Sequence, residues 1–348
     1  MKNLLIITQK VDTEDDLLGF FVDWVRGFSK RFDKVFVITL AKGNYNLPPN
    51  VLVYSLGKEG HNSKIARAFN FYKYLFQLTP KSVGIFAHMS PIFVIASWPT
   101  ALIYRKRIIL WYLHRSVTMR LRIAEKLCYK IATAARESLR LKSEKIVEIG
   151  HGINIDKFKT ERNWENNKLR ILSVGRISRI KNYDTLLRAA KILKDKAINF
   201  NIKIIGQPIM GPDFCYFEFL KSLKEKLDLR DSVEFLGFIP YGKMPDYYKN
   251  SDIVVGLTPD GGIDKTILEG MASGCIALTS NSVNRKYFGP YANKLIFAYH
   301  DSADLAQKIE ALNYMPAEKK DISQFLLKSV YNHHNLETLI NRLTELFL

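Results

Sequence analysis

Short apolar runs alternate with helix-periodic stretches along the whole sequence, and this alternation most constrains the fold. In the first half, the runs that read as strands lie at 3–8, 34–40, 51–56, 83–88 and 107–113. In the second half, they lie at 169–175, 201–206, 232–238, 252–258 and 275–280. Between several runs, apolar residues recur at three- and four-residue spacing, as at Leu186, Leu187, Ala190 and Leu193. Strands separated by helices form βαβ units, so the pattern predicts an α/β protein with one parallel sheet in each half.

A polar segment between the halves, "KTERNWENNKLR" (159–170), lacks apolar periodicity and reads as a linker. The 348 residues are more than one hydrophobic core usually organises, so we expect Rossmann-like domains at 1–160 and 161–330. An amphipathic tail predicts a further helix at about 331–348, which can pack back on the first domain. Open parallel sheets bind ligands at the carboxyl ends of their strands, so we expect the two domains to face each other across a cleft.

Several other protein classes are disfavoured by composition. The three cysteines are widely spaced, which argues for a reducing compartment and against a disulfide framework or a zinc site. The apolar run at the N-terminus is too short for a signal peptide. The most apolar stretch, 84–104, is interrupted by His88, Pro91 and Pro99, and so lacks the roughly 20 apolar residues of a spanning helix. These features predict a cytoplasmic protein.

Positive charge is concentrated in the first half. The whole chain carries 52 Lys and Arg against 34 Asp and Glu, a net charge of +18. Residues 1–160 contribute +14 (26 basic, 12 acidic) and the rest +4 (26 basic, 22 acidic). Such a surface attracts phosphates of nucleic acid, lipid headgroups or a substrate, unless it is only a solvated lysine-rich face. Helices expected at 63–76 and 120–145 are basic, and the first is also aromatic, which suits contact with an anionic membrane; alternatively its aromatic residues belong to the core.

The stretch "VGRISRIKNYDTLLRAAKIL" (174–193) predicts a strand, a basic loop and a helix. The strand ends at Gly175, and the helix begins near Asn182 or Asp184, both of which are suitable N-caps. Arg176 and Lys181 flank the helix start, where free N–H groups and the helix dipole already favour an anion. A guanidinium and an ammonium added there would make a diphosphate clamp, while the alternative is a pair of ordinary surface cations.

The stretch "PDGGIDKTILEGMASGCIAL" (259–278) predicts a second helix start after a glycine pair. Asp264 fits the N-cap, and Gly274 closes the helix. Lys265 and Glu269 are four residues apart on one face and could form a simple surface ion pair. However, the lysine stands at the end of the helix where the dipole disfavours a cation. An anionic ligand at this helix start would explain the lysine and leave Glu269 to hold sugar hydroxyls.

Three motifs in order carry a family resemblance: "GRISRIK", "FLGFIPYGKMPDYYKNSD" and "DKTILEGMASGCIALTS". Together with "EIGHGINIDKFK" (148–159), they resemble the family 4 glycosyltransferases of the GT-B fold, and the likeness is stronger in the second half than in the first. The resemblance implies two Rossmann-like domains, of which the second binds a nucleotide-sugar donor and the first the acceptor. It also implies retention of anomeric configuration, without a metal or a cofactor. The co-substrate would be a UDP- or GDP-sugar.

The resemblance also assigns roles to residues of the second half. Arg176 and Lys181 would neutralise the diphosphate leaving group, and Glu269 would accept hydrogen bonds from the ribose hydroxyls. The other donor-binding positions are Gly175, Gly262, Ile263, Asp264 and Lys265. Members of the family usually carry a further glutamate eight residues before the retained one, and this chain has Gly261 there. Asp260, Asp264 or Lys265 could compensate.

Fewer positions stand out in the first half. Gly19 matches the glycine that opens the first helix of the family, on the acceptor and phosphate side. His114, in "WYLHRS", matches the family's histidine at a strand end and is the best candidate for a catalytic histidine. His88 ends another apolar run and is a second acceptor-side candidate.

The predicted function is transfer of a sugar from a nucleotide-sugar to a glycan acceptor, which can be lipid-linked, in polysaccharide or glycoconjugate synthesis. We expect the enzyme to be cytoplasmic, with an anionic membrane surface as a further partner. A GT-B nucleotide-sugar epimerase, an inactive sugar-binding relative and a basic nucleic-acid-binding protein remain alternatives. Nucleic acid is not an expected partner, because no recognisable nucleic-acid-binding module is present. A glycan phosphorylase would need a pyridoxal lysine site that the sequence does not offer.

Overall fold

The computed structural model describes residues 2–160, 162, 164 and 168–348, which form two compact units. Unit 1 comprises the residues up to Gly152, together with Pro240–Gly242 and His334–Leu348. Unit 2 comprises Ile153–Ile239 and Lys243–His333. The predicted linker and the domain boundary after residue 160 lie partly outside the described residues. The first segment of unit 1 ends at Gly152, eight residues before that boundary.

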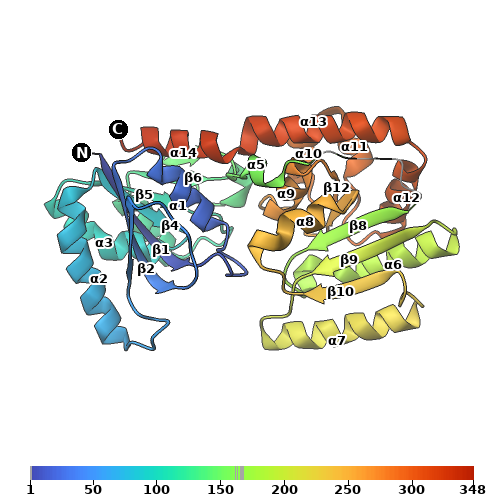
Figure 1. The fold of residues 1–348 in the computed structure, drawn as a ribbon, viewed down its shortest axis with the longest axis horizontal. Helices are drawn as coiled ribbons and strands as arrows, with labels where there is room; N and C mark the ends of the chain where they lie inside the picture. The colour runs from blue at the N-terminus through green and yellow to red at the C-terminus, as the bar shows by residue number, and fades with distance from the viewer. Residues whose placement is uncertain (1, 161, 163, 165–167) are drawn as a thin grey trace. The chain divides into compact units, whose positions relative to one another are not determined.

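Unit 1 is built on a parallel sheet that, within the described residues, has seven strands in the order β3-β2-β1-β4-β5-β6-β7 (Figure 1). The strands are β1 (Asn3–Val11), β2 (Lys34–Lys42), β3 (Val51–Ser55), β4 (Gly84–His88), β5 (Arg107–Trp111), β6 (Lys130–Thr133) and β7 (Ile146–Glu148). Both faces of its central strands are covered, which is why their sequences are nearly continuous apolar runs. The order reverses direction between β1 and β4.

Helices on both faces bury this sheet. The helices are α1 (Phe21–Ser29), α2 (Lys64–Leu78), α3 (Pro91–Ile103), α4 (Met119–Leu127) and α14 (Leu336–Glu345). The helix expected over 120–145 is wrong beyond Leu127, because the next residues form β6 and pair with β5 and β7. Pairing inside the sheet overrides the helical preference of this alanine-containing stretch.

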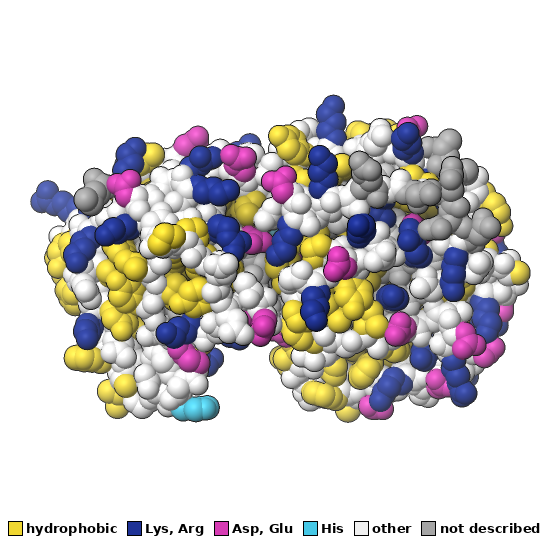
Figure 2. All heavy atoms as spheres, viewed as in Figure 1, with side chains coloured by type: hydrophobic (Ala, Val, Ile, Leu, Met, Phe, Trp, Pro, Cys, Tyr) yellow, Lys and Arg dark blue, Asp and Glu magenta, His cyan; other side chains and the backbone are white. Residues whose placement is uncertain are grey.

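Helix α2 has one buried and one exposed face. Ser63 caps it by accepting a hydrogen bond from the Ala66 N–H, and Phe71, Leu75 and Leu78 point into the core. Other apolar residues of the helix, such as Phe69, are exposed. The suggestion that its aromatic residues are core therefore holds for only part of the helix. Figure 2 shows hydrophobic side chains beside Lys and Arg over the part of unit 1 that contains α2.

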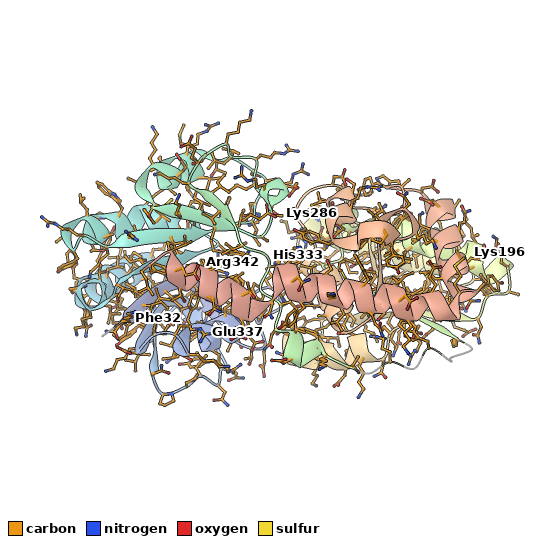
Figure 3. All side chains as sticks on the ribbon, turned by 90° about the horizontal axis from the view of Figure 1, so that it is seen from above. Phe32, Lys196, Lys286, His333, Glu337 and Arg342 are labelled. Carbon is orange, nitrogen blue, oxygen red and sulfur yellow. The ribbon has the colours of Figure 1, made fainter. Side chains whose placement is uncertain are left out.

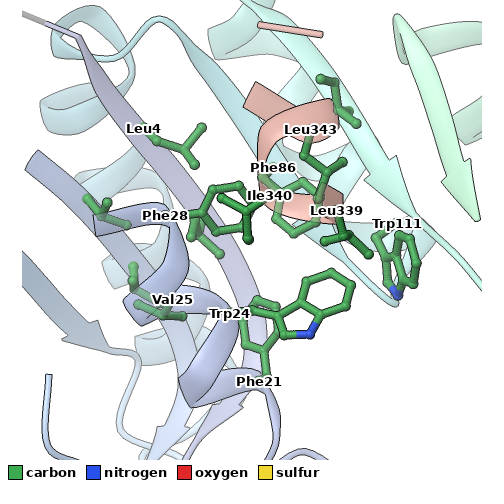
Figure 4. Close-up of a cluster of buried hydrophobic side chains, with 14 of the residues drawn as sticks. Leu4, Phe21, Trp24, Val25, Phe28, Phe86, Trp111, Leu339, Ile340 and Leu343 are labelled. Carbon is green, nitrogen blue, oxygen red and sulfur yellow. The ribbon is translucent and has the colours of Figure 1, made fainter. Parts of the chain in front are cut away.

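Residues near the C-terminus complete the core of unit 1. Helix α14 begins after Asn335, whose side chain accepts from the Glu337 N–H, and it packs along α1. Glu337, labelled on α14 in Figure 3, forms an ion pair of 3.0 Å with Arg31. The buried side chains that α14 shares with the sheet and α1 are shown in Figure 4: Leu4, Phe21, Trp24, Val25, Phe28, Phe86, Trp111, Leu339, Ile340 and Leu343. Burial of each large apolar side chain stabilises the fold by about 1.5–3 kcal/mol.

Unit 2 contains a smaller parallel sheet in the order β10-β9-β8-β11-β12, with five strands among the described residues. The strands are β8 (Leu169–Val174), β9 (Phe200–Ile205), β10 (Val233–Gly237), β11 (Ile253–Gly256) and β12 (Ile276–Thr279). The helices are α5 (Ile155–Phe158), α6 (Tyr183–Asp195), α7 (Gly211–Lys226), α8 (Met244–Lys249), α9 (Lys265–Ala272), α10 (Arg285–Phe288), α11 (Ala292–Leu295), α12 (Ser302–Asn313) and α13 (Pro316–His334). The strand order reverses between β8 and β11, which is the point where open α/β sheets usually bind ligands.

Candidate functional site

Two loops meet at the reversal point of the unit 2 sheet. One follows β8 and leads into α6, and the other follows β11 and leads into α9. Because β8 and β11 are neighbouring parallel strands, their carboxyl ends lie at the same edge of the sheet. Most of the residues predicted to bind a nucleotide-sugar lie in these two loops or in the first turns of α6 and α9.

The loop after β8 is shaped by close backbone contacts at Gly175. Its φ of +154° suits glycine, and a Cβ there would lie 3.0 Å from the Lys181 Cε atom. The buried Tyr183 hydroxyl donates a 2.7 Å hydrogen bond to the Gly175 carbonyl, and burial raises the pKa of this tyrosine. On β9's side, a Cβ at Gly206 would come within 2.0 Å of the Gly175 oxygen. The loop is therefore held close to the sheet, and the Lys181 side chain lies against Gly175.

The two predicted phosphate-binding cations each have a carboxylate partner. The Arg176 side chain is 41% exposed, and its Nε lies 3.8 Å from an oxygen of Asp213 in the first turn of α7. Lys181 Nζ lies 3.1 Å from Asp264 Oδ1, which joins the loop after β8 to the loop after β11. Helix α6 begins at Tyr183, and Asn182 occupies the N-cap without a capping side-chain hydrogen bond. Both cations therefore lie at the ligand-binding edge of the unit 2 sheet, and each is paired with a carboxylate.

Asp264 occupies the predicted N-cap of α9, yet its side chain does not cap the helix. One carboxylate oxygen binds Lys181, and the other accepts a hydrogen bond from the Thr258 hydroxyl in the loop after β11. The carboxylate is thereby turned away from the N–H groups of the first turn. Asp264 works as a tie between the two loops and not as the cap that its position predicts.

Lys265 and Glu269, four residues apart on one face, form an ion pair on α9. The pair is not a surface pair, however, because the two side chains are only 18% and 4% exposed. The second oxygen of Glu269 accepts a 3.0 Å hydrogen bond from the Tyr248 hydroxyl of α8. Because both carboxylate oxygens have partners, the group is held in a fixed orientation beneath the helix start.

Contacts with the segment after β12 hold the loop 259–264. Asn281 donates a 2.8 Å hydrogen bond to the Gly262 carbonyl, and Ser282 N–H donates one of 2.6 Å to Asp260. Ile263 is buried, and so is Gly261, the position at which a second carboxylate was expected. Asp260 and Asp264, the proposed substitutes for that carboxylate, are engaged by a backbone amide and by Lys181.

In unit 1, His88 ends β4 and is fully buried. Its ring stacks on Phe21 with centroids 3.7 Å apart, and Nδ1 lies 3.1 Å from the Thr8 hydroxyl. Burial lowers the pKa of His88 to about 3, so its imidazole is neutral at physiological pH. Contrary to expectation, the structure does not place His88 on a surface that an acceptor could reach.

The other two unit 1 candidates lie near loops. His114 is exposed in the loop after β5, and its ring lies 5.5 Å from that of Tyr112. Gly19 lies in the turn before α1, where a Cβ would come within 2.7 Å of the Asp15 carbonyl oxygen. This close contact explains why glycine is needed at the start of the first helix.

The fold matches solved structures over essentially its whole length. HepE from Anabaena, solved in complex with UDP-glucose, superposes with a TM-score of 0.78 at 15% sequence identity, covering 99% of each chain. Sucrose-phosphate synthase from Thermosynechococcus elongatus superposes with a TM-score of 0.79 at 14% identity, covering 100% of this chain and 98% of that one. The chain has a GT-B fold. At these identities the likeness concerns the fold alone.

Sequence comparisons add a family match for part of this GT-B chain. Residues 154–325, just under half of the chain, match the model of the family "Glycosyl transferases group 1". Alpha-monoglucosyldiacylglycerol synthase of Streptococcus pneumoniae is 27% identical over 203 residues, 56% of this chain and 42% of that protein. The amylovoran biosynthesis glycosyltransferase AmsK of Erwinia amylovora is 32% identical over 145 residues, 40% of this chain and 34% of that protein. The matches span less than half of these relatives, and together the findings support a GT-B glycosyltransferase.

Three residues of the site escaped the sequence analysis: Asp213, Tyr248 and Thr258. Asp213 and Tyr248 bind predicted site residues on other elements of the GT-B fold, and Thr258 binds Asp264 within the loop between β11 and α9. Tyr248 stands in the quoted "MPDYYK" motif, but adjacent tyrosines do not reveal which ring is buried. Only its burial and its hydrogen bond to Glu269 distinguish Tyr248 from Tyr247, which is half-buried.

Among the described residues, no cluster of three or more His, Cys, Asp and Glu side chains is arranged to hold a metal ion. No helix there combines the length and apolarity required to cross a membrane.

Proposed function

We propose that this protein is a retaining glycosyltransferase that moves a sugar from a nucleotide-sugar to a lipid-linked glycan at the cytoplasmic face of a membrane. The transfer would serve polysaccharide or glycoconjugate synthesis. The observation that carries the proposal is the pairing of Lys181 with Asp264 across the reversal point of the unit 2 sheet, with Arg176 beside it. Two cations at the edge where such sheets bind ligands are suited to a diphosphate. The names of the relatives, which include a lipid glucosyltransferase and a polysaccharide enzyme, agree with this class.

Donor binding would proceed by exchange of anionic partners. The diphosphate would replace Asp213 at Arg176 and Asp264 at Lys181, so that each cation remains neutralised before and after binding. These cations would then stabilise the negative charge that grows on the departing phosphate, which is the largest electrostatic demand of the reaction. Neutralisation by these two side chains is why we propose a reaction without a metal ion. Retention would follow if the departing phosphate itself helps to deprotonate the acceptor hydroxyl on the same face.

Glu269 is proposed to accept hydrogen bonds from the ribose hydroxyls of the donor. Lys265 and Tyr248 would keep its carboxylate oriented, because each binds one of its two oxygens. Backbone N–H groups of Gly262 and Ile263 would approach the donor sugar. The lack of a side chain at Gly261 leaves room at the place where related enzymes present a carboxylate, so the contact with the donor sugar would differ from theirs.

Acceptor binding and the remaining catalytic role are assigned to unit 1. His114, exposed after β5, would bind the transferred sugar or the acceptor hydroxyl by hydrogen bonding. Gly19 would allow close backbone approach before α1. The buried position of His88 supports only an indirect part for this residue, in holding β1 and β4 together through Thr8.

Nucleotide-sugar binding by site variants tests the proposal. UDP-glucose, GDP-mannose and ADP-glucose would be titrated while thermal stability is followed, and we expect one of them to raise the unfolding temperature. Arg176→Ala and Lys181→Ala should each weaken that binding by about tenfold to a hundredfold, since each removes a charge-assisted contact. Lys191→Ala, at an exposed ion pair with Asp195, is the matched control and should bind normally.

Analysis of the reaction products then tests whether the bound sugar is transferred. Transfer to an acceptor with an unchanged anomeric configuration, seen by NMR, would complete the assignment. Nucleotide-sugar affinity that is unchanged in both Arg176→Ala and Lys181→Ala would refute the proposed site. Conversion of the donor to an isomer without any acceptor would refute transfer in favour of epimerisation.

A further inference from the structure

Three neighbouring helices of unit 1 present a large apolar surface to solvent. Helices α2, α3 and α4 cover one face of the sheet, since their buried residues belong to one core cluster and α3 contacts both of the others. Their outward sides expose Ile65, Phe69, Tyr72, Phe76, Ile92, Trp98, Leu102, Ile103, Met119 and Ile123. We call these ten residues the α2–α4 face. Several are strongly exposed, including Ile65 at 83%, Phe69 at 71% and Met119 at 72%. Contiguous apolar surface of this kind marks an interaction site.

Charge around the α2–α4 face is mostly positive. Residues 60–124, which contain all ten residues of the face and the loops between its helices, hold ten Lys and Arg and no Asp or Glu. The next residue, Glu125 of α4, is half-buried and accepts a 2.8 Å hydrogen bond from the Ser143 hydroxyl. Helix α3, in the middle, has no charged residue from Pro91 to Ile103. Its neighbours provide the cations: Lys64, Arg67 and Lys73 on α2, and Arg120 and Arg122 on α4. The face is thus an apolar centre between two basic flanks.

This arrangement favours one occupant over the others. A symmetric dimer through the α2–α4 face would bring each basic flank against a copy of itself or of the other flank, and no carboxylate in residues 60–124 could offset the repulsion. A spanning helix is not involved, because α3 is only 13 residues long. An anionic bilayer matches both properties, since headgroup phosphates attract the flanks and the acyl boundary accepts the apolar centre.

We propose that the α2–α4 face binds the surface of an anionic lipid bilayer, with α3 inserted deepest and the basic ends of α2 and α4 at the headgroups. The inference extends the proposed function by naming the surface that engages the membrane. It does not depend on which donor the enzyme uses. Binding would be reversible, because the contact combines shallow apolar insertion with attraction that salt screens.

A pocket at the edge of the α2–α4 face links membrane contact to the acceptor. It has a volume of about 390 Å³ and is lined by Ser90, Pro91, Ile92, Tyr112, Thr118, Met119 and Arg120. Ile92 and Met119 belong to both the pocket and the face. Because the pocket follows the carboxyl ends of β4 and β5, it lies at the ligand-binding edge of the unit 1 sheet. A lipid-linked acceptor held in the bilayer could therefore place its polar head in this pocket, and this step rests on the proposed function.

Vesicle binding tests the membrane contact directly. The full chain should co-sediment with vesicles of phosphatidylglycerol and phosphatidylcholine at low salt, and much less with phosphatidylcholine alone or at 0.5 M salt, where attraction is screened over about 4–5 Å. Phe69→Ser combined with Leu102→Ser should weaken partitioning by at least about tenfold, because two exposed apolar side chains no longer insert. Phe214→Ser, at a phenylalanine of unit 2 that is 54% exposed, is the matched control and should bind like the unchanged chain.

Trp98 reports which surface touches the lipid. It is 36% exposed on α3, whereas Trp24 and Trp111 are each 1% exposed and the half-buried Trp164 belongs to unit 2. Brominated lipids should therefore quench tryptophan fluorescence of the full chain, and Trp98→Phe should remove most of that quenching from the vesicle-bound protein. Quenching that persists in Trp98→Phe would overturn the assignment of the face, even if vesicles bind.

The remaining outcomes separate this inference from the proposed function. No binding to anionic vesicles at low salt would overturn the membrane contact, and so would a dimer in solution that Phe69→Ser with Leu102→Ser dissociates. Nucleotide-sugar binding is measured on the same samples. Donor binding without vesicle binding would refute the inference alone, while vesicle binding without donor binding would refute the proposed function alone.

Discussion

The buried pair of Lys265 and Glu269 predicts an asymmetric response to mutation. Lys265→Met removes the cation and leaves the Glu269 carboxylate, whose side chain is 4% exposed, hydrogen-bonded to the Tyr248 hydroxyl. At an effective dielectric constant of 20, charges about 4 Å apart attract by about 4 kcal/mol, before desolvation is subtracted. Leaving a buried charge without its partner typically costs 3–5 kcal/mol, and the partial exposure of Lys265 lowers our expectation to about 2–4 kcal/mol.

A double-mutant cycle measures this coupling. The unfolding temperature of Lys265→Met should fall by roughly 4–16 °C, because 1 kcal/mol corresponds to about 2–4 °C for a unit of this size. Adding Glu269→Gln should recover more than half of the loss, since the buried charge is then gone while the amide oxygen can still accept from Tyr248. Lys191→Met, in the exposed pair with Asp195, should change stability by less than about 0.5 kcal/mol. Effects of Lys265→Met and Glu269→Gln that simply add would refute the buried coupling.

Three further predictions rest on other parts of the chain. His88 has a folded pKa lowered to about 3 against an ordinary 6.5, so its contribution is fully present above pH 6.5; as pH falls towards 3, the unfolded state gains a proton that the folded state refuses. Between pH 6.5 and 3, the free energy of unfolding should therefore fall with pH, and urea titration measures this fall. The slope should exceed that of His88→Leu by up to about 1.4 kcal/mol per pH unit, and equal slopes would contradict this account. Gly206→Ala should destabilise unit 2 and weaken donor binding because its Cβ would meet the Gly175 oxygen at 2.0 Å, whereas Gly211→Ala, with nothing within 4 Å, should not; similar effects of the two in thermal shift would argue against the tight loop. Of the three cysteines only Cys215 is exposed, so a thiol reagent at neutral pH should label one site per folded chain, and rapid labelling of two or more would contradict the packing.

Most strands could be predicted because the sequence of a buried parallel strand is one continuous apolar run. The predicted runs at 34–40 and 169–175, for instance, differ from β2 and β8 by two residues or fewer at each end. Strands β6 and β7 could not be found this way. The first is short and lies in an alanine-containing basic stretch, and its strand conformation depends on hydrogen bonds to β5 and β7, which are remote in sequence.

The site was predictable to the level of residue types and spacings. The four-residue separation of Lys265 and Glu269 implies contact, but whether that contact is exposed depends on the packing of α9 against β11, β12 and α8, which no local pattern encodes. Likewise, Asp264 has the residue type and position of an N-cap. Its diversion to Lys181 is decided by a partner 83 positions away. His88 shows the same limit, because an apolar run that ends in histidine does not reveal whether the ring lies inside the fold or on its surface.

The assignment of α14 to unit 1 has a consequence for biosynthesis. Leu339, Ile340, Leu343 and Phe347 supply part of the core against which α1 packs, although about 180 residues of unit 2 precede them in the chain. During translation, domains generally fold from the N-terminus onward as they emerge. Here the unit that emerges first must wait for residues 336–347 before its core is complete. Until then its apolar surface under α14 is exposed on the ribosome, so nascent unit 1 is the part of this chain that most needs a chaperone.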